Sequence, residues 1–383
     1  MVTFELANFL VKAGAKVTVY TYIALDPARE LFKKSGIKVI TPKDNHKFSL
    51  ADFDYVWVHS LTLPRTLLDD LKTPHDKYPA FVFLHMSALE TIPDEHPWIY
   101  DLEKKLSSLS LYISDGALNS NKKYGLPKNI AYFRNPAPPE FYEKRRTHLP
   151  EKPSKILIVS NHPPKEVIEL KEILAKRGIE VSNYGEGQEK YSLITPAVLA
   201  KYDAVITIGK TAQYCLVNNT PVYIYDWYGG PGWLTQKNYE ATKSFHFSGR
   251  FTSQKTSAAI ADELVNGYKD AAEFQTASLD EFTEDFLLDK VLNKLLILLK
   301  AKNIGVVDSE YIESVKSAEL CSEIRFTASE ELGELRARAS TLVGDLKHYK
   351  NELGAVTSAK SYRLMLFCLK PYTKLRAFFR KKA

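Results

Sequence analysis

A glycine, a lysine and a threonine stand between an expected strand and an expected helix, in the segment Ile208-Gly-Lys-Thr211. The N-terminus of a helix is electropositive, so Gly209, Lys210 and Thr211 could present backbone N–H groups and an ammonium to a phosphate. A Walker A loop needs another glycine five residues before Gly209, and that position is Ala204. The pattern disfavours a P-loop NTPase and leaves two interpretations: an anion site, or an ordinary left-handed turn with an exposed lysine.

Other strand ends in the same half of the chain are polar or rich in glycine: Ser160, Asn161, Gly185, Asp226, Gly229 and Gly230. Ligands of open α/β sheets collect at the carboxyl ends of strands, so these residues are candidates for binding a donor. A dinucleotide fingerprint at Gly185 fails, because Lys190 stands where its third glycine is needed. The segment Phe247-Ser-Gly-Arg250 adds a guanidinium suited to a bidentate phosphate contact. Pairing of Arg250 with a surface carboxylate is the alternative.

Two histidines end neighbouring apolar segments in the first half of the chain, His59 after Val56-Trp-Val and His85 after Phe81-Val-Phe-Leu. Imidazoles at adjacent strand ends would line a cleft, and His85 is the better candidate to contact a transferred group. A buried structural role is the alternative, and we favour it for His59. The sequence has no cluster of His, Cys and carboxylate with metal-ligand spacing, and no GxSxG elbow.

Helical and strand patterns alternate through the first 150 residues. A helix around Phe4–Val11 ends before Gly14, and strands are expected at Lys16–Tyr22, Ile37–Ile40, Tyr55–His59, Ala80–His85 and Leu109–Ser114, with a helix near Pro27–Lys34. This alternation predicts a parallel, helix-covered sheet. A doubly wound sheet normally begins with a strand and a glycine-rich turn, whereas this sequence begins inside a helix. Either the start codon is placed late, which we favour, or a central strand is absent and leaves a slot in the sheet.

A second α/β series follows the Pro-rich stretch Asn135-Pro-Ala-Pro-Pro139 and a charged linker. Its expected strands are Lys155–Ser160, Ile179–Tyr184, Asp203–Ile208 and Pro221–Tyr225, its expected helices Lys165–Lys176 and Ala212–Val217. Thr195-Pro196 is a helix start, with Thr as the N-cap. Gly229-Gly-Pro-Gly232 is expected to interrupt the regular secondary structure before Thr235.

Composition is that of a soluble globular protein, with 45% hydrophobic and 26% charged residues. The three cysteines, Cys215, Cys321 and Cys368, match no disulfide or metal spacing, which favours a reducing cytoplasm. No apolar run of about 18 residues could span a membrane. The last 24 residues carry eight cations and no acidic residue, so their charge of +8 exceeds the net charge of +6 of the whole chain. The rest of the chain is therefore slightly acidic. A nucleic-acid binder would more often carry its basic stripe on a folded face.

The chain ends in two further segments. Residues 301–358 are mainly helical, with apolar residues at alternating spacings of three and four over three heptads: Leu332, Leu335, Ala339, Leu342, Leu346, Tyr349 and Leu353. They predict either a dimeric coiled coil, marginal because of Gly333 and Gly344, or an amphipathic helix packed on its own domain. Residues 359–383 mix cations with Leu and Phe, a composition that binds anionic lipid surfaces. A solvated tail that docks on a partner is the alternative.

Several of these segments together resemble the family 4 glycosyltransferases, over about residues 2–300. The first half is similar in Thr3-Phe-Glu-Leu-Ala-Asn-Phe-Leu-Val-Lys-Ala-Gly14, Asp54-Tyr-Val-Trp-Val-His59, Leu84-His85 and Arg134-Asn-Pro-Ala-Pro138. The second half resembles a subgroup from bacterial surface-polysaccharide clusters in Tyr202-Asp-Ala-Val-Ile-Thr-Ile-Gly-Lys-Thr211, Pro221-Val-Tyr-Ile-Tyr-Asp226 and Phe247-Ser-Gly-Arg250.

The resemblance implies an α/β fold of the GT-B type, in which two Rossmann-like domains face each other across a cleft. Residues 1–150 would form the acceptor-side domain and residues 151–300 the domain that binds the nucleotide-sugar donor. It also implies metal-independent catalysis, with helix dipoles and basic side chains neutralising the departing diphosphate. Lys210 and Arg250 would stabilise the diphosphate, His85 would face the sugar, and Gln213 would lie near the nucleoside.

The sequence departs from the family where two glutamates usually stand eight positions apart. The turn at Gly209 is too short for the first, and the second position falls on Tyr214, beside Gln213. Two functions remain in view. One is transfer of a sugar to a lipid-linked polysaccharide acceptor at the inner face of the cell membrane, without a cofactor. The other is a non-catalytic GT-B subunit that binds or anchors a partner glycosyltransferase.

Overall fold

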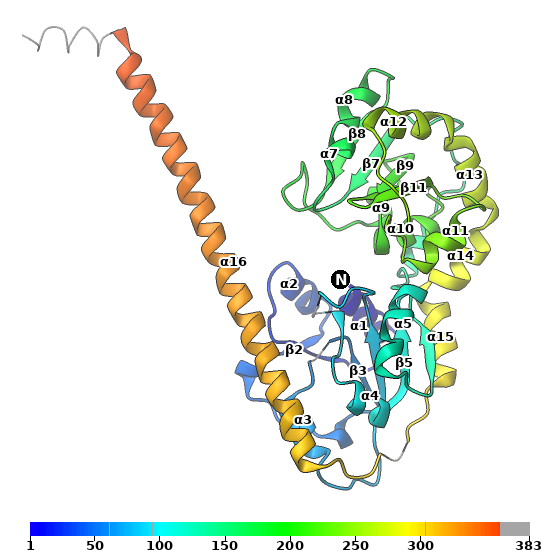
Figure 1. Cartoon of the computed structure of the whole chain (residues 1–383), viewed down its shortest axis with the longest axis vertical. Helices are drawn as coiled ribbons and strands as arrows, with labels where there is room; N and C mark the ends of the chain where they lie inside the picture. Colours follow the sequence, from blue (N-terminus) through cyan, green and yellow to red (C-terminus); the bar gives the residue numbers. More distant parts are fainter. Residues whose placement is uncertain (61, 93–94, 303, 361–383) are drawn as a thin grey trace, which may run out of the picture. The chain divides into compact units, whose positions relative to one another are not determined.

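The computed structural model describes residues 1–60, 62–92, 95–302 and 304–360 (Figure 1). It divides into a compact unit, Met1–Ser322, and a second unit, Glu323–Ala383.

The first half of the compact unit contains two parallel sheets. One pairs β1 (Thr18–Tyr20) with β2 (Lys38–Ile40), and the other has the order β3-β4-β5-β6. The strands of the second are Tyr55–Val58, Ala80–His85, Ser107–Tyr112 and Ile130–Tyr132. No ladder joins β1 to β3 in the described part of the chain. In a doubly wound sheet the first strand lies between the second and the fourth. β1, β2 and β3 correspond to the second, third and fourth strands of such a sheet, so the gap between β1 and β3 lies at the position of the first. The expected single sheet is therefore two.

Helices cover both faces of the four-stranded sheet. Phe81 and Phe83 of β4 point to one face, and Val82 and Leu84 point to the other, as alternation along a strand requires. The first face is covered by α3 (Arg65–Asp70), α4 (Tyr100–Leu106) and the beginning of α16; the second by α1 (Val2–Lys12), α5 (Asp115–Asn121) and α15 (Leu288–Leu298). The helix α2 (Ala28–Lys34) packs with α1 against β1 and β2.

The second half of the compact unit holds a five-stranded sheet of order β11-β10-β9-β7-β8. Its parallel strands are β7 (Lys155–Val159), β8 (Glu180–Tyr184), β9 (Ala204–Thr207) and β10 (Val222–Asp226). One face is covered by α10 (Gly209–Val217) and α14 (Leu279–Phe286), the other by α8 (Leu170–Ala175), α12 (Ser257–Asn266) and α13 (Tyr268–Ala277). Short helices complete this half: α6 (Glu140–Glu143), α7 (Lys165–Ile168), α9 (Pro196–Leu199) and α11 (Tyr239–Ser244).

The fifth strand of this sheet corrects a sequence expectation. The sequence predicts that the glycines of Gly229-Gly-Pro-Gly232 interrupt the regular structure, but Gly229–Trp233 forms the strand β11, antiparallel to β10. A β-carbon on Gly230 would lie 2.0 Å from the carbonyl oxygen of Ile224. These glycines therefore permit close approach of neighbouring backbones, which explains a strand made of residues that usually form turns.

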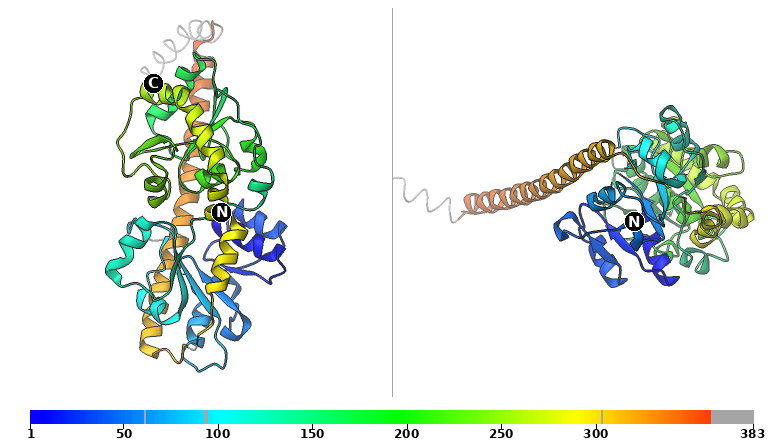
Figure 2. Two further views of the ribbon diagram at one scale, coloured as in Figure 1. Left: turned by 90° about the vertical axis from the view of Figure 1, so that its right-hand side faces the viewer. Right: turned by 90° about the horizontal axis from the view of Figure 1, so that it is seen from below.

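The chain crosses back to the first half through α14 and α15 (Figures 1 and 2). Leu288, Leu292 and Leu295 of α15 pack in one cluster with Val82 and Leu84. Residues that follow also pack on this half, because Ile304, Val307, Ile312 and Val315 join the cluster of Phe81 and Phe83.

The last helix, α16 (Ser309–Ser358), belongs to both units. Within the compact unit, its Glu319 is buried and lies 3.5 Å from Arg65. Beyond Ser322 the helix carries the predicted heptads. The membrane-binding segment expected at 359–383 lies outside the described residues, apart from Ala359 and Lys360. Among the described residues, no helix is both long and apolar enough to cross a membrane.

Candidate functional site

The ends of β7 and β8 bring two predicted donor-binding segments together. A β-carbon on Gly185 would lie 2.0 Å from the carbonyl oxygen of Ser160, so only glycine allows the two turns to touch. The side-chain oxygen of Asn161 accepts a hydrogen bond of 3.0 Å from the backbone N–H of Glu186. Ser160 and Asn161 thus lie beside Gly185, at the carboxyl edge of the sheet as predicted.

The end of β10 is held by its own carboxylate. Asp226 accepts hydrogen bonds from the backbone N–H groups of Tyr228, at 2.7 Å, and Gly249, at 3.0 Å. This carboxylate ties the turn after β10 to the segment that carries Arg250. The guanidinium of Arg250 lies over the ring of Tyr228, 5.6 Å from its centroid, and the residue is exposed. Asp226 therefore positions Arg250, while its own oxygens are occupied by backbone donors.

The helix α10 begins at Gly209, three residues earlier than the sequence pattern indicated. Gly209 has a φ of +57°, and its N–H donates to the carbonyl of Phe247 at 3.2 Å. The first turn of α10 is therefore made by Gly209, Lys210 and Thr211, as an anion site at a helix N-terminus requires. The Gly209 N–H itself is already bonded to protein.

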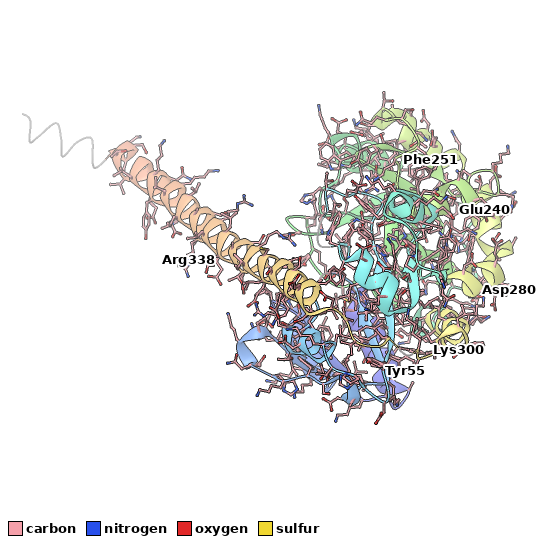
Figure 3. The ribbon with its side chains drawn as sticks, turned by 60° about the horizontal axis from the view of Figure 1, so that its bottom comes forward. Tyr55, Glu240, Phe251, Asp280, Lys300 and Arg338 are labelled. Atoms are coloured by element: carbon pink, nitrogen blue, oxygen red, sulfur yellow. The ribbon has the colours of Figure 1, made fainter. Side chains whose placement is uncertain are left out.

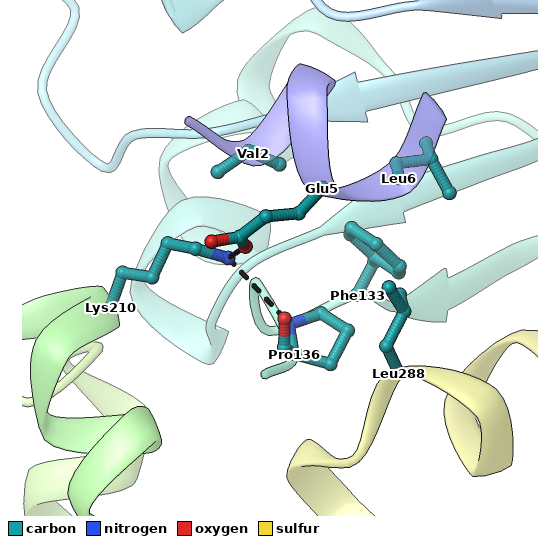
Figure 4. A pocket seen from close by; sticks show the side chains of 7 residues that line it. All are labelled: Val2, Glu5, Leu6, Phe133, Pro136, Lys210 and Leu288. Atoms are coloured by element: carbon teal, nitrogen blue, oxygen red, sulfur yellow. Dashed lines mark hydrogen bonds and ion pairs between the residues drawn. The ribbon is translucent and has the colours of Figure 1, made fainter. Parts of the chain in front are cut away.

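The ammonium of Lys210 is held by three oxygens, and Figure 4 shows its contacts with Glu5 and Pro136. It forms an ion pair of 2.6 Å with Glu5 of α1 and donates to the carbonyls of Asn135, at 3.2 Å, and Pro136, at 3.3 Å. Burial lowers the pKa of Lys210, and the neighbouring Glu5 carboxylate opposes that effect. The lysine side chain is 16% exposed. Lys210 thus lies at the predicted place, but already paired with a carboxylate.

Glu5 also accepts a hydrogen bond from the hydroxyl of Tyr214, one turn along α10. Tyr214 is the position at which the resembled family usually has a carboxylate. In this protein a carboxylate reaches the same neighbourhood from α1, in the other half of the compact unit. Sequence patterns did not identify Glu5, because a glutamate in the first turn of an amphipathic helix has no distinguishing signal.

A half-buried histidine lies behind the first turn of α10. His246 has ring nitrogens 3.4 Å from the Gln213 side-chain nitrogen and 3.5 Å from that of Asn135. Its pKa is lowered to about 3, first by burial and then by the charges of Arg134, Lys210 and Arg250. A hydrogen bond with the backbone of Ile113 acts in the opposite direction.

Three cations lie near enough to His246 to lower its pKa: Arg134, Lys210 and Arg250. We name these three residues the cation cluster. Arg134 lies 3.5 Å from Asp115 and stacks over the ring of Tyr132. Lys210 and Arg250 were predicted from the sequence, whereas His246 and the role of Arg134 were not, since tertiary packing alone brings them together.

One member of this cluster, Lys210, lines a cavity of about 840 Å³. Its polar lining includes Glu5, Asn8, Thr195, Lys210 and Thr211. Its remaining walls come from α1, the Pro138–Lys144 segment and Ser192–Pro196. The volume lies within the range of small-ligand sites, which run from about 300 to 1,000 Å³.

Two predicted contact residues are buried instead. Gln213 is fully buried against His246, so its amide positions that ring and does not reach the cavity surface. His85 is also fully buried, with Nε2 3.0 Å from Glu103, whose carboxylate accepts from Ser110 at 2.6 Å. The His85 ring stacks on that of Tyr112 at 4.7 Å. This burial argues against the expectation that His85 faces the transferred sugar, and favours a structural role.

No group of three or more His, Cys, Asp or Glu side chains able to hold a metal ion occurs in the described ranges. The electropositive groups at the carboxyl edge of the second sheet are side-chain cations and the start of α10. These are groups that can bind an anionic ligand directly.

No family model matches the chain, and no curated protein matches it. Among solved structures it is similar to a glycosyltransferase from Rickettsia africae ESF-5, with a TM-score of 0.48 and 11% identity, over 78% of this chain and 93% of that one. It is also similar to the glycotransferase of kitacinnamycin, with a TM-score of 0.40 and 14% identity, over 78% of this chain and 95% of that one.

Proposed function

We propose that the protein is a glycosyltransferase of the GT-B type, resembling family 4, that moves a sugar from a nucleotide-sugar donor to a lipid-linked polysaccharide acceptor. The donor diphosphate would bind at the carboxyl edge of the second sheet. The observation that carries this proposal is geometric: Lys210, in the first turn of α10, lines a cavity of about 840 Å³.

The chemistry requires a stabilised leaving group. When the bond between the anomeric carbon and the diphosphate breaks, negative charge grows on the departing phosphate oxygen, and fixed cations lower the energy of that state. Lys210 and Arg250 would supply this charge, helped by the dipole of α10. Arg134 would add a third cation. The transferred sugar and the acceptor hydroxyl would occupy the cavity, and Ser160, Asn161 and Gly185 would lie on the nucleotide side.

The acceptor side and the location of the protein belong to the same proposal. Residues 359–383 carry the basic and aromatic composition that attracts an anionic surface, at about 1 kcal/mol per cation near the membrane. We propose that the protein is cytoplasmic and associates peripherally with the inner face of the cell membrane, where a lipid-linked acceptor would be presented.

The second candidate is a non-catalytic subunit that binds or anchors a partner glycosyltransferase. The Glu5–Lys210 pair favours it, because an ammonium with three oxygen partners is not free to receive a phosphate. The two candidates differ in what a nucleotide does to the purified protein. A transferase binds its donor and consumes it, whereas a non-catalytic subunit leaves the donor intact.

Calorimetric titration of the full chain with UDP, GDP and dTDP tests the proposal. We expect one of them to bind. Lys210→Ala should weaken the binding of that nucleotide by about 10- to 100-fold, which corresponds to the loss of one hydrogen bond to a charged group. Lys176→Ala is the matched control, since Lys176 is an exposed lysine at the end of α8. It should bind as the unmodified protein does.

Release of the nucleoside diphosphate from sugar nucleotides that carry the bound base then distinguishes the transferase from the non-catalytic subunit. Turnover that depends on Lys210 supports the transferase. Nucleotide binding without turnover, with or without an acceptor lipid, supports the non-catalytic subunit. Equal nucleotide affinity in Lys210→Ala and the unmodified protein would exclude the proposed diphosphate site.

A further inference from the structure

The second unit presents an apolar stripe along α16. Its members recur at alternating spacings of three and four and are all exposed; those larger than alanine are between 47% and 69% exposed: Leu332, Leu335, Ala339, Leu342, Leu346, Tyr349, Leu353 and Val356. We name these eight residues the seam. Figure 3 shows side chains around this part of α16, Arg338 among them. Soluble proteins rarely leave such a contiguous stripe uncovered.

The seam is not a continuation of the face by which α16 packs on the compact unit. That face uses Ile312, Val315 and Glu319. Continued at helical spacing, its row reaches Phe326, Glu330 and Gly333, which offers little apolar surface. The seam starts on a different face, and its 3.5-residue period is that of a coiled coil.

The helix also needs a partner for its own stability. Gly333, Gly344 and Gly354 each cost about 1 kcal/mol relative to alanine within a helix. Most helical stability in proteins comes from packing of an apolar face. In heptad terms the three glycines fall at positions b, f and b, outside the seam, and a β-carbon on any of them would meet nothing within 4 Å. The glycines therefore weaken the helix without interrupting its seam.

We propose that the seam pairs with the seam of a second copy of this chain, in a parallel and in-register coiled coil. Leu332, Ala339, Leu346 and Leu353 would occupy positions a, and Leu335, Leu342, Tyr349 and Val356 positions d. Eight layers over 25 residues make a contact about 36 Å long.

The flanking charges select a second copy and the parallel direction. Parallel pairing places each g residue opposite the e residue five positions on in the partner. Glu331 then faces Arg336, and Asp345 faces Lys350, so both fully charged pairs are attractive. An antiparallel pair with all eight layers overlapped would place Arg338 opposite Glu352, but it would also place Arg336 opposite Lys350 and Asp345 opposite its own copy. Like charges in those positions oppose that arrangement.

Parallel pairing has a consequence for the proposed membrane association. It would bring the two Ser358 ends together, so that two basic segments would begin at one place. Two linked weak lipid contacts bind more tightly than either alone, because the second contact forms within an already bound complex. The pairing itself does not depend on the proposed transferase activity.

Light scattering of the full chain after size exclusion, over a range of micromolar concentrations, measures the assembly. We expect the mass of two copies. Leu342→Lys places charges in a d layer and should halve the mass. Ser340→Lys adds the same charge two residues away, outside the seam, and should leave two copies. Unchanged thermal unfolding of the compact unit would show that Leu342→Lys is folded.

Disulfide formation by Leu335→Cys, in a Cys321→Ser and Cys368→Ser background, tests the direction of pairing. In a parallel register the two introduced thiols meet across the seam and oxidise readily, whereas in the antiparallel pair each faces position 353. A monomer in the unmodified protein would overturn the proposal, as would three or more copies. A two-copy species in which Leu335→Cys fails to cross-link would overturn the parallel register. A monomer whose compact unit is destabilised by Leu342→Lys would indicate that the seam packs within its own chain.

Discussion

Glu5 and Lys210 form an ion pair of 2.6 Å between the first helix and the beginning of α10. The two side chains are 11% and 16% exposed, so the pair is only slightly screened by water. It joins the two halves of the compact unit. It also means that a phosphate approaching Lys210 meets a carboxylate on the same ammonium.

Glu5→Gln is expected to have opposite effects on stability and on ligand affinity. Loss of the charged partner should lower the free energy of unfolding by about 2 kcal/mol, because Lys210 remains buried. Removal of a negative charge beside the diphosphate should tighten nucleotide binding by about tenfold, measured by calorimetric titration. Glu143→Gln is the control, since Glu143 lines the same cavity but is exposed. Weaker nucleotide binding by Glu5→Gln would assign Glu5 to the ligand site itself.

The free energy of unfolding and the nucleotide affinity also distinguish a structural role of His85 from a contact with the sugar. His85→Ala leaves the buried Glu103 carboxylate without its imidazole and should lower the free energy of unfolding by about 3 kcal/mol. Because His85 is fully buried, nucleotide affinity should not change. His148→Ala, at an exposed position, should affect neither quantity. A stable His85→Ala protein that has lost only transfer activity would restore the sugar-contact interpretation.

Local patterns predicted most elements of the compact unit. The strand at Ala80–His85 and the Thr195 cap of α9 are found where the sequence placed them. Both depend on signals within a few residues, a continuous apolar run in one case and a capping hydroxyl before proline in the other. The strand β11 was missed, because its glycines serve close backbone contacts that no local pattern reveals.

The candidate site was only partly predictable, for the same reason. Gly209, Lys210 and Asp226 lie at the expected strand ends, since topology alone places them there. Glu5 and His246 could not be selected, because they reach the site from distant segments. Gln213 was expected near a nucleoside, yet the helix face that carries it points into the core.

The contact between the turns at Ser160 and Gly185 gives a sharp test of local geometry. Gly185→Ala would place a β-carbon 2.0 Å from a carbonyl oxygen and should lower the free energy of unfolding by about 3 kcal/mol. Gly187→Ala is the matched control, because Gly187 has a φ of +71° but nothing within 4 Å. That change should cost about 1 kcal/mol, for the backbone conformation alone. Chemical denaturation measures both, and equal losses would mean that the two turns do not touch.

Gly344→Ala should stabilise the second unit. The glycine lies at an outward position of α16, and alanine is favoured over glycine by about 1 kcal/mol in a helix. If helix formation is coupled to pairing, each copy contributes this gain, and the dissociation constant of the dimer should fall at least tenfold. Light scattering on dilution measures it, with Gly305→Ala, in a loop of the compact unit, as the control. A more helical α16 with unchanged dissociation would uncouple the two.

The half-buried imidazole of His246 predicts a loss of stability in acid. Its pKa of about 3 in the folded chain is below the value of 6.5 expected when unfolded, so the unfolded chain binds protons that the folded chain does not. The stability from this group is complete above about pH 6.5 and is lost as the pH falls towards 3. At pH 5 the loss should be about 2 kcal/mol.

Other groups titrate in the same range, His59 among them, whose pKa burial lowers to about 4. The contribution of His246 is therefore the difference between the unmodified protein and His246→Asn, because asparagine tolerates the φ of +55° at this position. Unfolding free energies of the two proteins, measured between pH 7.5 and 5, should converge by about 2 kcal/mol as the pH falls. Parallel curves would mean that His246 has the same pKa in the folded and the unfolded chain, so the cation cluster would gain a fourth positive charge at pH 5.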